Sequence, residues 1–216
     1  MKKEKLKIYY EDKNLIVVYK KSGIPTIKSD NYKDNLYSMV FDYLHKKNQK
    51  IFVVHRLDKD TSGLVIFAKS EKVRDNLQLN WDSVKREYIA IVHGITSESG
   101  VIKSYLKETK TLYSYSSDDK VNGKYAETHY ERLDYNKQYS LLKINILTGR
   151  KNQIRVHMQD NNTPILGDRK YGKKDGFRNM MLLANSLDFI NPVTRERVHI
   201  DIGVPQTYLS VMENAR

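Results

Sequence analysis

The stretch from Ile51 to Ala68 constrains the fold more than any other part of the sequence, because it places two apolar runs around a polar loop. The runs, 51–54 and 64–68, are rich in Ile, Val and Phe, which favour the pleated, half-buried surface of a strand. The loop between them holds an imidazole, a guanidinium, two carboxylates, two hydroxyls and a glycine. Binding and catalytic side chains often lie on such a loop when a rigid scaffold supports it. The stretch therefore predicts two sheet strands and a site centred on an acid.

An ordinary surface turn is the alternative interpretation of this loop. Asp, Ser and Gly, which occur at positions 60–63, are common turn residues. Arg56 could then form a surface ion pair with Asp58 or Asp60, which contributes little to stability. Because perturbed acids mark functional sites only statistically, the residue types alone leave both interpretations open.

The charge of the chain points to an anionic partner. Its 216 residues suffice for one domain with a substantial core, and they carry 38 Lys and Arg against 26 Asp and Glu, a net charge of +12. The excess is spread along the chain, since residues 1–50 hold twelve lysines and six acids. We expect nucleic acid as the first candidate partner and an acidic membrane surface as the second. A charged surface that only favours solubility is the alternative.

Several classes of protein are disfavoured by residues that the sequence lacks. Without cysteine there is no disulfide framework, thiolate nucleophile or cysteine-based zinc site. The charged start at 1–5 does not lead into the apolar segment of a signal peptide, and no apolar run approaches the ~18 residues that span a membrane. We therefore expect a cytoplasmic protein. The sequence also shows no metal or nucleotide signature, and we expect a monomer that uses no metal and no cofactor.

Alternating and helical patterns predict an α+β fold in which strands outnumber helices. Apolar spacing predicts a helix from Leu36 to Leu44, capped by Asp34 or Asn35, and Ser70 can cap a second helix that extends to Trp81. Two more helices are expected at 151–160 and after Pro205. The polar stretch that follows the strand at 101–106 is expected to end in a hairpin tip at 116–120. The predicted strands cover 6–10, 15–19, 51–54, 64–68, 86–92, 101–106, 125–133, 139–147, 181–189 and 198–202.

The run HRLDKDTSGLVIFAK, residues 55–69, closely resembles the signature of the RluA-type pseudouridine synthase family. The aspartate of HRLD is that family's catalytic residue, and it falls on Asp58. Four further segments resemble family motifs in the same order along the chain. They are KREYIA at 85–90, GKYAET at 123–128, LTGRKNQIRVH at 147–157, and PILGD at 164–168 with YG at 171–172.

The resemblance implies one catalytic domain over residues 1–216, with no separate N-terminal RNA-binding domain. It implies an α+β fold whose mixed, mostly antiparallel sheet carries a few helices, with an active-site cleft across the sheet. The implied reaction is isomerisation of specific uridines in structured ribosomal or transfer RNA to pseudouridine. The bond from ribose to nitrogen breaks, the uracil turns, and the base is rejoined through carbon.

The resemblance assigns the catalytic roles to Asp58, Tyr88 and Arg155. Asp58 must be ionised to act on the ribose as nucleophile or base. Arg155 is expected to hold it in that form, because a guanidinium can bond a carboxylate bidentately and stays charged. Tyr88 can stack on the uracil or take part in removing the proton from the new junction. By residue type alone it would be one more half-buried tyrosine among sixteen.

RNA binding is assigned to residues on both sides of these groups. The target base must leave its stack, and the family resemblance gives Arg56 the role of filling the vacated space. His55 is expected to support the loop, with a simple packing role as the alternative. Residues 150–178 hold eight Lys or Arg against three Asp, which predicts a phosphate track or a solvated face. The expected contacts there are Arg150, Lys151, Gln153, Arg169 and Lys170.

The chain departs from the family pattern in two places that matter below. Asn152 replaces the histidine that is common before QIR, and the segment Lys20-Lys21-Ser22-Gly23 lacks the proline of the usual Lys-Pro-x-Gly. Two rival functions are a noncatalytic RNA-binding or ribosome-assembly factor and a hydrolase with paired carboxylates. The presence of Asp58, Tyr88 and Arg155 together counts against the first. Nothing beyond Asp58 and Asp60 marks the second.

Overall fold

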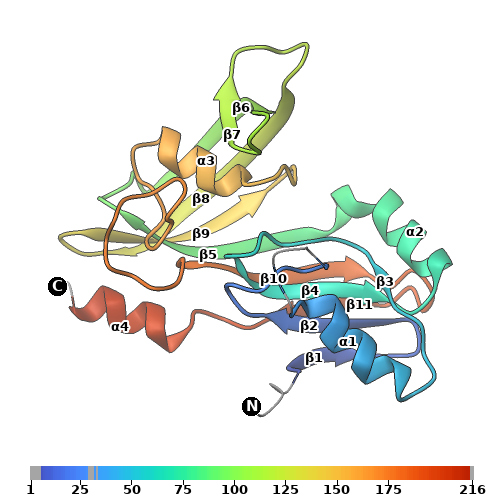
Figure 1. The fold of residues 1–216 in the computed structure, drawn as a ribbon. Helices are drawn as coiled ribbons and strands as arrows, with labels where there is room; N and C mark the ends of the chain where they lie inside the picture. The colour runs from blue at the N-terminus through green and yellow to red at the C-terminus, as the bar shows by residue number, and fades with distance from the viewer. Residues whose placement is uncertain (1–5, 29–31, 33, 215–216) are drawn as a thin grey trace. The chain divides into compact units, whose positions relative to one another are not determined.

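The computed structural model describes residues 6–28, 32 and 34–214, so the charged start at 1–5 lies outside the described residues. The backbone forms two compact units, each of which is described by itself. The first comprises Met1–Lys85 and Ser186–Asp201, and the second comprises Arg86–Asn185 and Ile202–Arg216. The described residues form eleven strands and four α-helices (Figure 1), which confirms the expected α+β fold. That the chain acts as one catalytic domain stays a prediction, as does the cleft.

Antiparallel strands form the centre of the first unit. Strand β2 (Leu15–Lys20) pairs with β1 (Ile8–Glu11) on one side and with β4 (Ser62–Ala68) on the other. The short β3 (Phe52–Val53) pairs with the end of β4, and β11 (Arg197–Asp201) pairs with the last residues of β10 (Leu182–Ile190). All seven residues of β4 are buried, so the apolar run in the sequence becomes a core strand.

Two capped helices accompany these strands. Helix α1 (Leu36–His45) begins after Asn35, whose Oδ1 accepts a hydrogen bond from the backbone N–H of Ser38 at 2.9 Å. Helix α2 (Glu71–Leu79) begins after Ser70 as expected. The prediction that Trp81 continues α2 is wrong. The helix ends at Leu79, and Trp81 lies in a separate 3₁₀ turn, Trp81–Ser83.

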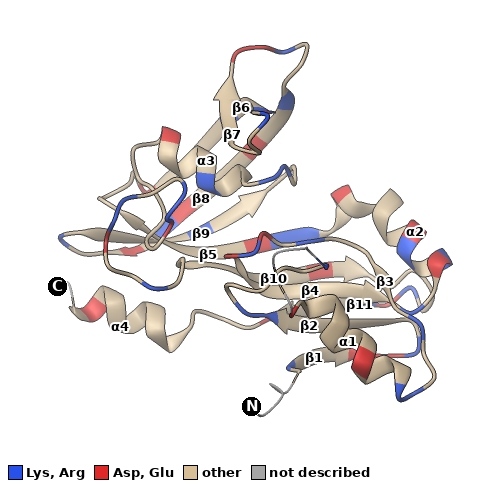
Figure 2. Cartoon of the chain, in the orientation of Figure 1, with Lys and Arg blue, Asp and Glu red and all other residues tan. Residues whose placement is uncertain are grey.

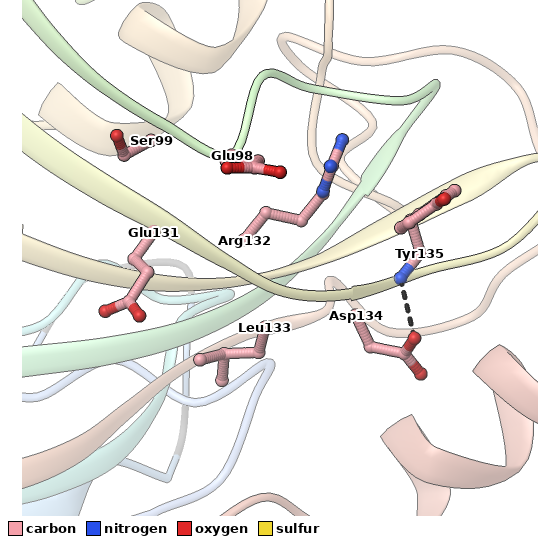
Figure 3. A pocket seen from close by; sticks show the side chains of 7 residues that line it. All are labelled: Glu98, Ser99, Glu131, Arg132, Leu133, Asp134 and Tyr135. Carbon is pink, nitrogen blue, oxygen red and sulfur yellow. Dashed lines mark hydrogen bonds between the residues drawn. The ribbon is translucent and has the colours of Figure 1, made fainter.

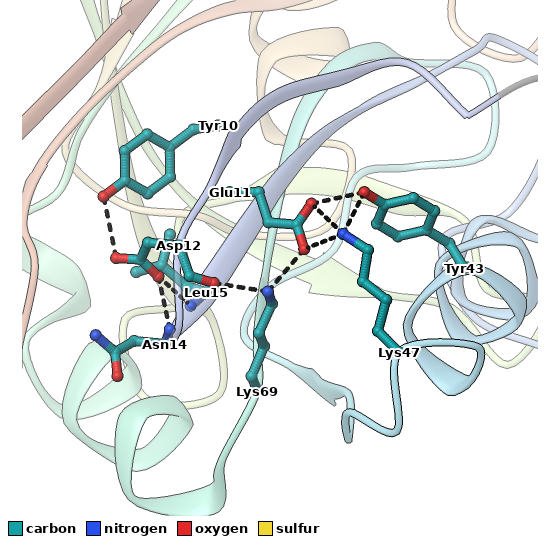
Figure 4. Close-up of polar contacts among 8 residues, drawn as sticks. All are labelled: Tyr10, Glu11, Asp12, Asn14, Leu15, Tyr43, Lys47 and Lys69. Carbon is teal, nitrogen blue, oxygen red and sulfur yellow. Dashed lines mark hydrogen bonds and ion pairs between the residues drawn. The ribbon is translucent and has the colours of Figure 1, made fainter.

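A cluster of charges ties β1 to α1 and to the end of β4 (Figure 4). The Glu11 carboxylate accepts hydrogen bonds from Lys69 Nζ at 2.8 Å, Tyr43 OH at 2.7 Å and Lys47 Nζ at 2.9 Å. Burial alone would raise the pKa of Glu11, but these three donors lower it to about 2. Lys69 also donates to the carbonyl of Asp12. The cluster therefore holds the β1–β2 turn against its neighbours.

The second unit contains a longer antiparallel arrangement of strands, in which neighbours are not always consecutive in the chain. Its strands follow the order β5, β9, β8, β6 and β7. Their bounds are Lys85–His93, Tyr139–Ile146, Lys124–Tyr135, Ser99–Glu108 and Ser114–Ser117. Helix α3 (Gln153–Asp160) packs against β7 and β8 (Figure 1), and α4 (Gln206–Asn214) packs against β9. The expected polar hairpin tip is only partly correct, because β7 is a strand that pairs with β6.

We expect Glu11→Gln to lower the free energy of unfolding by about 1–3 kcal/mol at neutral pH, because two lysines and a tyrosine lose a charged acceptor. The pKa of Glu11 is lowered from 4.5 to about 2, so its contribution is complete above pH 4.5 and declines as the pH falls towards 2. Urea unfolding of both proteins across this range should therefore show converging stabilities. A constant difference would contradict the assignment, and Asp118→Asn, at an exposed acid, is the control.

Candidate active site

The loop between β3 and β4 presents the sequence-predicted acid in the first unit. Leu57 is buried, whereas Arg56 is exposed and Asp58 is partly exposed. Thr26 secures the loop by two hydrogen bonds, because its Oγ1 donates to the Leu57 carbonyl at 2.9 Å and accepts from the Leu57 N–H at 3.1 Å. Of positions 60–63, which the turn interpretation covers, only Asp60 lies in the turn at 59–60, and Ser62 and Gly63 belong to β4.

Lys20 is a second anchor of this loop, a role that no sequence motif indicates. Its side chain is fully buried, and its Nζ donates to the carbonyls of Lys21, Ile24 and Lys59 at 3.0, 2.8 and 2.8 Å. Burial lowers the pKa of Lys20 to about 7, while the charges of Asp60 and Asp58 oppose the shift. The ammonium therefore connects the segment after β2 to the residue that follows Asp58.

The segment after β2 makes two further bonds to the loop. The N–H of Gly23 donates to the Lys59 carbonyl at 3.0 Å, and Ser22 Oγ donates to the Asp60 carbonyl at 2.7 Å. Gly23 has a φ of +90°, a conformation that residues with a side chain rarely adopt. The glycine of the Lys-Lys-Ser-Gly segment thus has a backbone role even though the family's proline is absent.

His55 has contacts that fit the packing role left open by the sequence. Its Nε2 accepts a hydrogen bond from the N–H of Ile66 at 3.0 Å, beyond the point where β3 stops pairing with β4. Its ring packs on Trp81 with 4.5 Å between ring centroids. An Nε2 that accepts requires the neutral ring to carry its proton on Nδ1. These contacts fix the start of the loop against β4 and Trp81. Direct RNA contact by His55 stays a prediction.

The second unit holds the other two predicted catalytic residues. Tyr88 lies in β5, opposite Ile144 of β9, and is 9% exposed. Arg155 lies on α3, where its Nε and Nη2 donate to the two carboxylate oxygens of Asp168 at 2.7 and 2.8 Å. Its guanidinium carbon lies 4.9 Å from the centre of the Tyr171 ring. Arg155 is thus held in a buried, bidentate pair.

Asp168 holds Arg155 in place, although its position at the end of the PILGD motif gives no sign of that role. Its side chain is fully buried, and Oδ1 also accepts from the backbone N–H groups of Lys170 and Tyr171. Burial would raise the pKa of Asp168, but the hydrogen bond and charge of Arg155 and these two N–H groups bring it below the usual value. The carboxylate is therefore ionised at neutral pH and fixes the orientation of Arg155.

Asn152 gives a physical reason for one departure from the family pattern. It has a φ of +57°, a left-handed conformation that asparagine tolerates better than most residues. Its Oδ1 accepts from Arg155 Nη1 at 2.9 Å, and its Nδ2 donates to Tyr171 OH at 3.2 Å. The residue in place of the family histidine therefore helps to orient Arg155.

All the hydrogen bonds described for the Gln153 side chain are to other residues of the protein. Its Oε1 accepts from Thr148 Oγ1 and from the Arg150 N–H, and its Nε2 donates to Glu127 O and Thr128 Oγ1. The residue is 3% exposed. A direct bond from this amide to RNA would require some of these bonds to break. The RNA contact stays a prediction, and the geometry favours a role in fixing the start of α3.

The four cations predicted to contact phosphate are all exposed in the second unit. Arg150 Nε donates to the carbonyl of Tyr125, Lys151 pairs with Glu108, and Lys170 Nζ donates to the carbonyl of Leu112. The fourth is Arg169. Figure 2 shows basic segments along the loop that follows α3. The surface is thus accessible to a phosphate backbone.

A pocket of about 580 Å³ lies elsewhere in the second unit (Figure 3). None of its lining residues belongs to the predicted site. They come from the residue before β6, from the first residue of β6 and from β8, namely Glu98, Ser99, Glu131, Arg132, Leu133, Asp134 and Tyr135. Three of them are acids, which disfavours RNA phosphate at this place.

Neither a metal site nor a membrane-spanning helix is found among the described residues. They include no group of three or more His, Cys, Asp or Glu placed to hold a metal ion. Among the described helices, none combines the length and the apolar character needed to cross a membrane.

Comparison with known proteins decides the family. Residues 14–160 match the family model described as RNA pseudouridylate synthase. The chain belongs to this family. It is an RNA pseudouridine synthase, an isomerase, and its RluA-type motifs cover most of the chain.

Relatives at about one third identity extend over nearly the whole synthase. An uncharacterized RNA pseudouridine synthase of Bacillus subtilis is 34% identical over 98% of this chain and 73% of its own length. The tRNA pseudouridine synthase C of Pasteurella multocida is 32% identical over 96% of this chain and 95% of its own length. The solved structure of human RNA pseudouridylate synthase domain containing 4 covers 97% of this chain and 93% of that one. It has a TM-score of 0.80 at 22% identity, which supports the fold.

We expect Asp168→Asn to lower the free energy of unfolding of the synthase by about 3–5 kcal/mol, because it leaves the buried Arg155 guanidinium without its bidentate anion. Urea unfolding measures the change. In a double-mutant cycle with Arg155→Met, the two effects should be strongly non-additive, since both variants break the same pair. Additive effects would show that the pair does not act as a unit.

We expect Lys20→Met to reduce turnover at saturating RNA by about 10–100-fold, because the loop that carries Asp58 loses the hydrogen bond from Lys20 Nζ to the Lys59 carbonyl, which ties it to the segment after β2. RNA affinity should change little, since Lys20 is buried and cannot reach phosphate. The measurement is single-turnover kinetics together with an RNA binding curve. Lys21→Met, at the exposed neighbouring lysine, is the matched control. An equal loss in both variants would argue against a specific role for Lys20.

Proposed function

We propose that this synthase converts specific uridines of structured ribosomal or transfer RNA to pseudouridine, with Asp58 as the catalytic carboxylate. The observation that carries the proposal is the HRLD loop itself, which places Asp58 on a partly exposed loop anchored by Lys20 and Thr26. The names of two relatives support the substrate class. They are ribosomal large subunit pseudouridine synthase C of Buchnera aphidicola, 30% identical, and tRNA pseudouridine synthase C of Pasteurella multocida.

The reaction is an internal rearrangement that needs no external group. The bond between ribose C1′ and uracil N1 breaks, C1′ joins uracil C5, and the proton on C5 is transferred to N1. Asp58 acts on the ribose either as a nucleophile at C1′ or as a base at C2′. Tyr88 is the proposed partner for the uracil, by stacking or by removing the C5 proton.

Arg155 is the proposed cation that keeps Asp58 ionised during this sequence. The bidentate bond to Asp168 and the bond to Asn152 use three of its five N–H donors and fix the plane of its guanidinium. Such preorganisation is what an electrostatic role requires, because no reorientation is needed when charge develops.

Access to Asp58 requires the target uridine to leave its stack. Arg56 is exposed and lies two residues before Asp58, which suits the proposed role of filling the vacated position. The exposed cations of the second unit, with the overall charge of +12, are proposed to bind the phosphate backbone.

We expect Asp58→Asn to leave RNA affinity within about tenfold of the intact protein and to abolish turnover, because the variant keeps the shape of the side chain but not its charge. The assay measures pseudouridine in unmodified ribosomal and transfer RNA transcripts and, separately, binding to the same transcripts. Asp60→Asn, on the same loop, is the matched control and should retain turnover. Wild-type turnover in Asp58→Asn would exclude the proposed role.

A pseudouridine map of the source organism would identify the substrate. The strain without the gene is compared with strains carrying the intact gene or the Asp58→Asn version. A site that disappears and returns only with the intact gene names the uridine. If no site changes and purified protein has no turnover, the RNA-binding factor becomes the better description.

A further inference from the structure

The loop from 169 to 178, here called the basic loop, has an unusual arrangement of charge. It contains five cations and a single acid, Asp175. The five cations are exposed, while the side chain of Asp175 is only 8% exposed. The cations are Arg169, Lys170, Lys173, Lys174 and Arg178. The acid is thus turned into the protein and the cations are turned out.

The partners of Asp175 are backbone groups and a histidine, not the neighbouring cations. Its Oδ2 accepts from the N–H of Gly167 at 2.7 Å and lies 2.9 Å from His93 Nε2, and its Oδ1 accepts from the N–H of Phe177 at 3.0 Å. Burial would raise the pKa of Asp175, but these hydrogen bonds bring it below the usual value. The ionised carboxylate therefore anchors the middle of the loop to β5 and to the chain before it.

Both halves of the basic loop have additional anchors. In the first half, Asp168 accepts hydrogen bonds from the N–H groups of Lys170 and Tyr171 through its side chain. In the second half, the Phe177 ring packs edge-on against Tyr139, with 6.4 Å between centroids. Asp175 lies between these anchors, so its loss would release the segment that carries Lys173, Lys174 and Arg178.

An acid within a basic segment would ordinarily pair with its neighbours and reduce the field that the segment projects. Here that pairing does not occur among the described residues, where Lys173, Lys174 and Arg178 form no ion pair. Cations without a nearby acid are suited to binding a phosphate backbone, because they can replace the counterions condensed on it. A merely solvated face would not require a buried carboxylate to hold it in shape.

We propose that the basic loop is a clamp for RNA phosphates and that Asp175 is the residue that positions it. This rests on the proposed function, because it assumes that the bound polymer is the RNA substrate. Lys173, Lys174 and Arg178 are thereby added to the phosphate contacts, and Asp175 acts on RNA only through them.

The sign of the effect of Asp175→Ala tests the proposal. The variant gains one unit of positive charge, so a simple count of charges predicts tighter RNA binding. A positioning role predicts the reverse, about tenfold weaker binding to a transcribed, unmodified stem-loop RNA, because the cations lose their common geometry. KM for that RNA should rise while kcat stays near the intact value. Asp118→Ala, at an exposed acid of the same unit, is the matched control and should not weaken binding. Tighter binding by Asp175→Ala would overturn the positioning role.

A second variant keeps the clamp testable if Asp175→Ala does not fold. Replacing Lys173, Lys174 and Arg178 by Gln removes exposed charges only, and it should reduce the slope of log affinity against log salt by about 2. The matched control replaces Lys46, Lys50 and Lys72, exposed lysines of the first unit, with the same change in net charge. Equal slopes for the two triple variants would overturn the clamp.

These binding measurements do not depend on catalysis. Repeating them in the Asp58→Asn background separates the two proposals. If the intact protein shows no turnover on any RNA but the slopes differ as expected, the proposed function fails, and the basic loop is a clamp for an RNA that is not a substrate. If turnover is normal and the slopes are equal, the reverse holds.

Discussion

The buried pair between Arg155 and Asp168 is the interaction on which the proposed roles of the second unit depend. The two residues lie thirteen positions apart, one on α3 and one in the following loop. The Asp168 carboxylate orients the guanidinium and also accepts hydrogen bonds from the N–H groups of Lys170 and Tyr171, at the beginning of the basic loop. The group proposed for electrostatic catalysis and the segment proposed for phosphate binding therefore share one anchor. Because a buried ion is costly without its partner, this geometry is strongly specified.

In the first unit, the loop that carries Asp58 is held in a comparable way, but by a buried cation instead of a buried anion. Lys20 is a buried ammonium that gathers three carbonyls, and Thr26 adds a reciprocal pair of hydrogen bonds to Leu57. In both units a buried charged side chain fixes backbone that would otherwise be irregular, since loop amides and carbonyls need partners when water is excluded. The exposed groups, Arg56 and the basic-loop cations Lys173, Lys174 and Arg178, are the ones proposed to contact RNA.

The local features of the fold were predictable because they depend on residues close together in the chain. Asn35 and Ser70 cap helices through N–H groups three positions away, and the apolar run of β4 became a core strand. The errors have physical reasons as well. Trp81 lies outside α2, in a 3₁₀ turn, and there its ring packs on His55. The serine-rich segment of β7 forms a strand because β6 supplies its hydrogen-bond partners. Pattern alone does not contain those neighbours.

The sequence by itself determined the family, the order of the helices and of every strand but β7, and the positions of Asp58, Tyr88 and Arg155, because motifs and periodicities are properties of the linear chain. Only the tertiary structure decided that Lys20 is buried, that Asp168 and Asn152 hold Arg155, and that Asp175 turns inward while its cationic neighbours face solvent. Each of these depends on which groups meet after folding. The burial and the partner of a charged side chain are set by contacts between distant segments, and residue type alone cannot specify them.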